Sequence, residues 1–269
     1  MHSKLTTLLS FFLILVLMAC GVQTMPAASG TELTVAAAAD LQFAFTDIAR
    51  LFEEQTGHKV TLVFGSTGQA AQQIENGAPY DLFAAANIDF VEQLAEKKLV
   101  LPDSVALYAQ GRIVLAVNRQ SGVTAATLTD LKSPSIKHVA IANPEHAPYG
   151  AAAMQALQST RMWEQTQDKL VFAENIQQAL QFVRTGDVEV GILALSVADV
   201  PEVTWTLIDE SLHQPLKQAL AVVASSPHPE LAREFAAFIN GEYGRPIMQR
   251  YGFTLPGETP ILAQSTSQP

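Results

Sequence analysis

Three short stretches of this chain share one plan: an apolar strand runs into small residues that carry Ser, Thr or Asp, and an amphipathic helix starts at once. They cover residues 34–41, 60–69 and 81–87. In α/β sheets, ligands bind beyond the carboxyl ends of the strands, where such junctions lie. A helix N-terminus presents unpaired N–H groups and the positive end of the helix dipole. The junctions therefore predict an α/β fold that holds an anion.

Strand-like runs alternate with helical patterns along the rest of the chain, which is typical of an α/β fold with largely parallel sheets. Two long apolar strands, 112–117 and 218–223, bracket a complete α/β block. This arrangement indicates an inserted second lobe, with the ligand cleft between the lobes. We predict that lobe I comprises residues 32–113 plus 217–260, and lobe II residues 114–216.

The N-terminus has the pattern of an export signal. Its apolar run, Leu8–Met18, is shorter than the ~20 residues that a membrane-spanning helix needs. Cys20, the single cysteine, stands at the processing site and resembles the lipidated residue of a bacterial lipobox. We predict a lipoprotein signal peptide over residues 1–20, a tether over 21–31 and a tail over 261–269. The alternative is an ordinary signal peptide with an incidental cysteine.

The charge of the chain limits its partners. The formal net charge is −10, and it becomes −11 once the signal, with Lys4, is removed. An acidic chain is unsuited to nucleic acid, which requires a basic surface. An anion would have to be bound by local dipoles and hydrogen bonds, because the overall field repels it.

The second junction carries the strongest candidate residues. Ser66 and Thr67 follow a strand and begin a helix, so their hydroxyls can donate to an oxyanion together with nearby N–H groups. The alternative is a capping box between Ser66 and Gln69, which needs no ligand. The spacing fits neither a Walker loop nor a nucleophile elbow.

Asp40, at the first junction, allows two interpretations. A carboxylate beside a bound dianion is repulsive unless it points away or shares a proton with the ligand. We favour Asp40 as the N-cap of the helix that begins at Leu41, a position that Asp prefers.

Three residues of the second block also invite a functional interpretation. Tyr149 could offer a phenolic donor, Asn175 either caps a helix or contributes to the site, and His146 could serve a metal or catalysis. The six histidines lack paired ligand spacing, and only one cysteine is present, so a zinc site is not expected.

Several motifs resemble the substrate-binding proteins of ABC-type molybdate transporters. They are residues 77–83, residues 141–150 with Pro144-Glu145-His146, the strand with Gly191-Ile192, and residues 250–253. The resemblance spans nearly all of residues 32–254 and implies a periplasmic-binding-protein fold (type II-like). Two lobes would close on a tetrahedral oxyanion without basic side chains. The implied oxyanion contacts are Ala39, Asp40, Ser66, Thr67, Ala86, Tyr149 and Ile176.

Two positions depart from the family pattern. Ala39 and Asp40 stand where a hydroxyl is often found, and Ala194 replaces a usual tyrosine, for which Tyr149 is a possible substitute. With these two changes, we expect oxyanion binding to be retained more readily than strict specificity for molybdate.

The resulting prediction is a monomeric, lipid-anchored, extracytoplasmic receptor rather than an enzyme. It captures molybdate or tungstate, needs no cofactor besides that ligand, and delivers it to an ABC permease. One alternative is a receptor for another tetrahedral oxyanion, such as phosphate or sulfate. A second is a secreted lipoprotein hydrolase using His146 or Asp40, which lacks a recognisable nucleophile–base pair.

Overall fold

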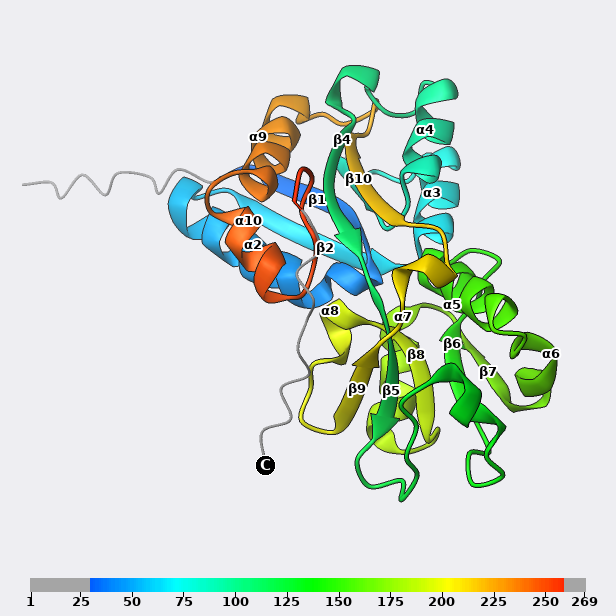
Figure 1. The fold of residues 1–269 in the computed structure, drawn as a ribbon. Coiled ribbons are helices and arrows are strands. Elements are labelled where there is room, and N and C mark those ends of the chain that lie inside the picture. Colours follow the sequence, from blue (N-terminus) through cyan, green and yellow to red (C-terminus); the bar gives the residue numbers. More distant parts are fainter. Residues whose placement is uncertain (1–29, 259–269) are drawn as a thin grey trace, which may run out of the picture. The chain divides into compact units, whose positions relative to one another are not determined.

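The computed structural model describes residues 30–258. The predictions for the signal peptide, Cys20, the tether up to residue 29 and the tail over 261–269 lie outside the described residues. Within residues 30–258 the fold is α/β, as predicted, and contains two five-stranded sheets (Figure 1). None of the helices in this part of the chain is long and apolar enough to cross a membrane.

The first sheet has the strand order β2-β1-β3-β10-β4. Its strands are β1 (Glu32–Ala38), β2 (Lys59–Gly65), β3 (Leu82–Ala85), β4 (Ala106–Gly111) and β10 (Leu216–Val222). Side chains alternate across a strand. Val35 and Ala37 therefore join one buried cluster and Ala36 joins the other.

Helices cover both faces of the first sheet (Figure 1). One layer contains α3 (Thr67–Glu75) and α4 (Ile88–Glu96). The other contains α2 (Gln42–Thr56), α9 (Pro229–Asn240) and α10 (Gly244–Arg250). The 3₁₀ turns η1 (Ala39–Leu41) and η2 (Pro102–Ser104) belong to the same half.

The second sheet has the strand order β7-β6-β8-β5-β9. Its strands are β5 (Ile113–Asn118), β6 (Val139–Ala142), β7 (Leu170–Ala173), β8 (Val190–Ala194) and β9 (Val203–Leu207). Its helices are α5 (Pro148–Ser159), α6 (Trp163–Thr166), α7 (Ile176–Thr185) and α8 (Leu195–Ala198), with the 3₁₀ turns η3 (Leu128–Lys132), η4 (Gln167–Lys169) and η5 (Glu210–Leu212).

Both sheets are mixed, so the prediction of largely parallel sheets is wrong. In the first sheet β1 is parallel to β2 and β3, whereas β10 is antiparallel to β3 and β4. In the second, β6 is parallel to β7 and β8, and β5 is antiparallel to β8 and β9. The chain enters the second sheet through β5 and returns to the first sheet through β10. These two strands are antiparallel to their neighbours, and antiparallel neighbours do not need the helical crossover that parallel neighbours require.

The chain passes between the sheets at Arg112, where β4 ends and β5 begins, and returns through β10 (Figure 1). The Arg112 guanidinium donates twice to the Gly252 carbonyl oxygen, at 3.1 and 2.8 Å. The crossing is therefore tied to the segment that follows α10.

Candidate functional site

The three predicted junctions meet at a small cavity of about 10 Å³. The first sheet contributes the segments after β1, β2 and β3, and the second contributes α5 and the start of α7. All seven residues predicted from the resemblance line this cavity. The full lining is Ala38, Ala39, Asp40, Gly65, Ser66, Thr67, Ala86, Ala147, Pro148, Tyr149, Asn175 and Ile176.

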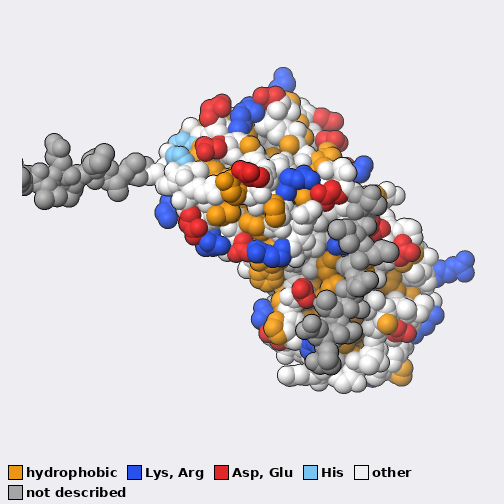
Figure 2. Space-filling view, turned by 60° about the vertical axis from the view of Figure 1, so that its left-hand side comes forward, with side chains coloured by type: hydrophobic (Ala, Val, Ile, Leu, Met, Phe, Trp, Pro, Cys, Tyr) orange, Lys and Arg blue, Asp and Glu red, His pale blue; other side chains and the backbone are white. Residues whose placement is uncertain are grey.

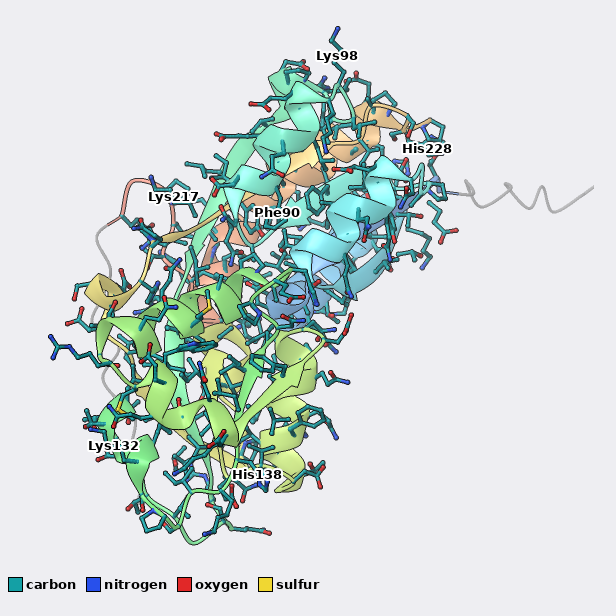
Figure 3. All side chains as sticks on the ribbon, turned by 90° about the vertical axis from the view of Figure 1, so that its right-hand side faces the viewer. Phe90, Lys98, Lys132, His138, Lys217 and His228 are labelled. Atoms are coloured by element: carbon teal, nitrogen blue, oxygen red, sulfur yellow. The ribbon has the colours of Figure 1, made fainter. Side chains whose placement is uncertain are left out.

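The cavity walls carry no Lys, Arg or His side chain among the described residues. The cationic side chains Lys98, Lys132 and Lys217 are exposed, and Figure 3 shows Lys98 and Lys132 on the outside of the molecule. Acidic and basic side chains are intermingled on the face that Figure 2 draws. The fixed positive groups near the cavity are therefore the positive ends of the helix dipoles at the starts of α3, α5 and α7.

Ser66 is held by two contacts. Its Oγ accepts a long N-cap bond from the Gln69 N–H at 3.4 Å and lies 2.8 Å from His146 Nδ1. The cap is therefore present, but the reciprocal half of a capping box is not, because the Gln69 side chain donates to Glu174 instead. Ser66 thus joins the second junction to the loop before α5.

Thr67 joins the second and third junctions. Its Oγ1 accepts a hydrogen bond from the Ala86 N–H at 3.0 Å, and the side chain is buried. Within residues 30–258 its own hydroxyl proton has no protein acceptor. That proton can serve a bound anion while the oxygen fixes the backbone at Ala86.

Asp40 is not a helix cap, contrary to the prediction. It lies inside the turn η1, so the residue at the N-cap of α2 is Leu41, and neither helix start receives a side-chain bond. The Asp40 carboxylate is 1% exposed. Its Oδ2 accepts hydrogen bonds from the Tyr149 hydroxyl at 2.9 Å and the Gln218 amide at 2.7 Å. Its Oδ1 has no hydrogen-bond partner among the described residues.

Burial raises the pKa of Asp40 to about 6, although hydrogen bonds from Gln218, Tyr149 and its own backbone lower it. Burial also raises the pKa of the Tyr149 and Tyr108 phenols well above their usual range, and the nearby Asp40 adds to both effects. Both phenols are neutral at physiological pH.

Tyr149 lines the cavity, but its hydroxyl proton is directed to Asp40 rather than to the cavity. Gln218 completes the cluster by donating to the Tyr149 oxygen at 3.0 Å. Sequence analysis missed Gln218. The available signal was an amide directly before the apolar residues 219–222 of β10, and the structure shows this amide to be buried.

His146 makes long-range contacts with α3, whereas Asn175 makes local hydrogen bonds. The His146 carbonyl accepts the Gly68 N–H at 2.9 Å, so this residue connects the loop before α5 to α3 through both its ring and its backbone. Asn175 caps α7 by accepting from Gln177 and Gln178 at 3.0 and 3.1 Å. No group of three or more His, Cys, Asp or Glu able to hold a metal occurs within residues 30–258.

Comparisons with known proteins agree with this architecture. Residues 33–254 match a family model described as "Bacterial extracellular solute-binding protein". The chain is 36% identical over 234 residues to the molybdate-binding protein ModA of Azotobacter vinelandii, covering 85% of this chain and 92% of the relative. It is 29% identical over 228 residues to a putative ABC transporter substrate-binding lipoprotein, YvgL, of Bacillus subtilis, covering 82% and 86%.

A solved structure of the Azotobacter vinelandii periplasmic molybdate-binding protein superposes with a TM-score of 0.79 at 29% identity. The match covers 83% of this chain and 99% of that chain. The predicted periplasmic-binding-protein fold is thus confirmed. By its match over residues 33–254, the chain belongs to the bacterial extracellular solute-binding protein family.

Proposed function

We propose that this protein is a receptor that binds molybdate, or the related tungstate, in the cavity between its two sheets. The observation that carries the proposal is the convergence of all seven predicted residues on one cavity without a cationic side chain. A relative 36% identical to this chain is a molybdate-binding protein. The family is one of solute-binding proteins, so the prediction of a binding protein rather than an enzyme is confirmed.

In this proposal, hydroxyls and backbone N–H groups hold the anion. Ser66 and Thr67 supply hydroxyls, and the N–H groups at Asp40, Ala86 and Ile176 lie at the starts of helical segments. The Ala86 N–H already donates to Thr67, so Ala86 contributes chiefly through its small size, which lets the anion approach. Ala39 and Tyr149 complete the wall.

The same proposal assigns the two sheets to two lobes. Lobe I comprises residues 32–113 plus 217–260 and lobe II residues 114–216, each built around one sheet, with the anion held between them. Delivery of the anion to an ABC permease is supported by the relative described as an ABC transporter substrate-binding lipoprotein. The receptor acts as a monomer.

Lipid anchoring through Cys20 completes the proposal. The apolar run that ends at this single cysteine supports it, as does the lipoprotein described among the relatives. The anchor would hold the receptor at the outer side of a membrane, with residues 21–31 as the tether.

Thermal unfolding with molybdate, tungstate, sulfate, phosphate and vanadate tests the proposed function. A ligand at a hundred times its dissociation constant adds about 2.7 kcal/mol of stability. We expect molybdate and tungstate to raise the melting temperature most. Unchanged melting with all five anions would contradict the proposal.

Asp40 favours a second candidate, a receptor for an anion that carries a proton, such as hydrogen phosphate. An ionised carboxylate can accept a hydrogen bond from a protonated anion but repels a bare dianion. A larger thermal shift with phosphate than with molybdate would select this candidate.

A further inference from the structure

Asp40 lines the candidate cavity, yet only one of its two carboxyl oxygens is used by the protein. Oδ2 accepts from Tyr149 and Gln218, while Oδ1 is buried and has no partner among residues 30–258. A buried polar atom without a partner destabilises the protein. A ligand in the cavity that Asp40 lines would be placed to satisfy this oxygen.

The surroundings leave the charge of Asp40 without a counter-ion. The titratable groups that face it are the phenols of Tyr149 on α5 and Tyr108 on β4. The contributions to its own pKa are burial and hydrogen bonds from uncharged groups. Arg112, which faces Tyr149, donates to the Gly252 carbonyl oxygen.

The elements packed around η1 add no free charge next to Asp40. The turn contacts α2, α7, α8 and β2. On α2, every charged residue has an ion-pair partner: Asp47 is paired with Arg250, Arg50 with Glu54, and Glu53 with Lys59 at the far end of β2.

The other elements add no unpaired charge next to Asp40 either. On α7, Arg184 is paired with Glu202. α8 contains no charged residue, and on β10 Lys217 is exposed. The His146 ring, in the loop before α5, contacts Ser66.

A fully deprotonated dianion and an ionised Asp40 would therefore meet in a cavity with no cation in its walls. Two like charges in close, dry contact shift the equilibrium toward protonation of one of them. The free oxygen, Oδ1, is the place for that proton, because Oδ2 can continue to accept from Tyr149 and Gln218 as the carbonyl oxygen of a neutral acid.

We propose that the site binds its oxyanion together with one proton, held between Asp40 Oδ1 and an oxygen of the anion. This inference rests on the proposed function and adds a specificity role for Asp40. When molybdate binds, Oδ1 takes a proton from solvent, forms an O–H bond and donates it to the anion. No covalent bond of the anion breaks. The pKa of about 6 agrees with this role, because above that pH Asp40 is ionised before binding.

The experiment is calorimetric titration of the purified protein with molybdate between pH 5 and 8.5, in pairs of buffers with different ionisation enthalpies. The wild-type protein is compared with Asp40→Asn and with Asp168→Asn. Asp168 is exposed and its side chain has no hydrogen-bond or ion-pair partner within residues 30–258, so this control removes one charge away from the site. Asn at position 40 keeps an oxygen for Tyr149 and Gln218 and presents a neutral donor on the other side.

We expect wild type and Asp168→Asn to take up nearly one proton per molybdate at pH 8, falling to none near pH 5. Their affinity should drop about tenfold per pH unit above pH 7. Asp40→Asn should bind with no proton uptake and a flat pH profile. Tight binding to wild type without proton uptake at pH 8 would overturn the inference and leave the proposed function intact. If none of the three proteins binds molybdate at any pH in this range, both the inference and the proposed function are overturned.

Discussion

The Thr67 hydroxyl has two functions in the site, one carried by its oxygen and one by its proton. Its oxygen accepts the Ala86 N–H at 3.0 Å, and its proton has no acceptor within residues 30–258. A bound anion can take that proton without disturbing the contact between the two junctions. Affinity and fold stability therefore depend on different atoms of the same side chain.

Thr67→Val should weaken molybdate binding at least tenfold. The substitution keeps the shape but removes a hydrogen bond to a charged ligand, which is typically worth about 1.5–3 kcal/mol. It also leaves the buried Ala86 N–H unpaired, so the free energy of unfolding should fall by about 1–3 kcal/mol. Thr67→Ser, which retains the hydroxyl, is the control. Calorimetry showing equal affinity for wild type and Thr67→Val would limit Thr67 to a structural role.

Asp40 should make stability fall as pH rises. Its pKa is raised from 3.8 to about 6 in the folded protein, so the folded state binds the proton more tightly than the unfolded state. The stabilisation is complete below pH 3.8 and is lost as pH rises through about 6. At ~1.4 kcal/mol per pKa unit this amounts to about 3 kcal/mol.

Chemical unfolding of wild type and Asp40→Asn at pH 4 and pH 8 measures this effect. From pH 4 to pH 8, the free energy of unfolding of wild type should fall by up to about 3 kcal/mol relative to that of Asp40→Asn, because Asn remains neutral. A difference that stays constant with pH would show that Asp40 does not titrate in this range.

The Asp40 cluster shows where sequence reasoning reaches its limit. The preference of Asp for N-caps is a local rule, and it failed because η1 moves the start of α2 to Gln42. Gln218, 178 positions away, reaches Asp40 only through the pairing of β10 with β3 and β4. Such a contact depends on tertiary structure, which the local pattern does not contain.

At the scale of helices and strands, the local patterns were informative. The helix after β2 begins at Thr67, as predicted, and Asn175 caps the helix after β7, which is one of the two roles left open for it. β4 and β9 were not predicted, although the sequence Val-Thr-Trp-Thr-Leu of β9 alternates apolar and polar residues as a half-buried strand does. The direction of β10 and β5 was missed because the chain crosses between sheets there.

The approach of α3 to the loop before α5 is set by Gly68. The Gly68 N–H donates to the His146 carbonyl oxygen, and a Cβ at this position would lie 2.8 Å from that oxygen. Any side chain at Gly68 must push the two elements apart. Because Ser66 and Thr67 immediately precede it, the effect should reach the cavity.

Gly68→Ala should therefore reduce molybdate affinity by at least tenfold while the protein remains folded. Gly65→Ala is the control in the same junction: it also adds a methyl group, at a residue that lines the cavity, but a Cβ there has no atom within 4 Å and so does not separate the two elements. Affinity is measured by calorimetry and folding by circular dichroism. Equal losses of molybdate affinity in the two variants would show that the effect does not come from separating α3 from the loop before α5.

At the scale of the whole molecule, the two sheets are joined across the cavity by several contacts. Tyr149 bonds to the Asp40 carboxylate, Ser196 donates to the Asp40 carbonyl at 2.9 Å, and His146 contacts Ser66. The cavity volume of about 10 Å³ corresponds to about one water molecule. A tetrahedral oxyanion, with five heavy atoms, needs more room. Binding therefore requires the cavity to widen while the Asp40–Tyr149 pair is kept, with the Ser196 and His146 contacts loosening, as in hinge motion around a ligand.

The predicted anchor also concerns the whole molecule. Cys20→Ala should prevent lipid attachment and leave the receptor soluble or unprocessed, whereas the wild-type protein should enter the detergent phase on partitioning. Cys20 lies outside the described residues, and the substitution should not alter molybdate affinity. Identical aqueous partitioning of both proteins would contradict the lipoprotein prediction.

The most direct test of the account is a crystal structure of the protein grown with molybdate, with anomalous diffraction used to place the molybdenum. We expect one molybdenum in the cavity lined by Ser66, Thr67 and Ile176, with anion oxygens at hydrogen-bond distance from both hydroxyls and from Asp40 Oδ1. Molybdenum bound elsewhere, or a cavity without it at saturating molybdate, would contradict the account.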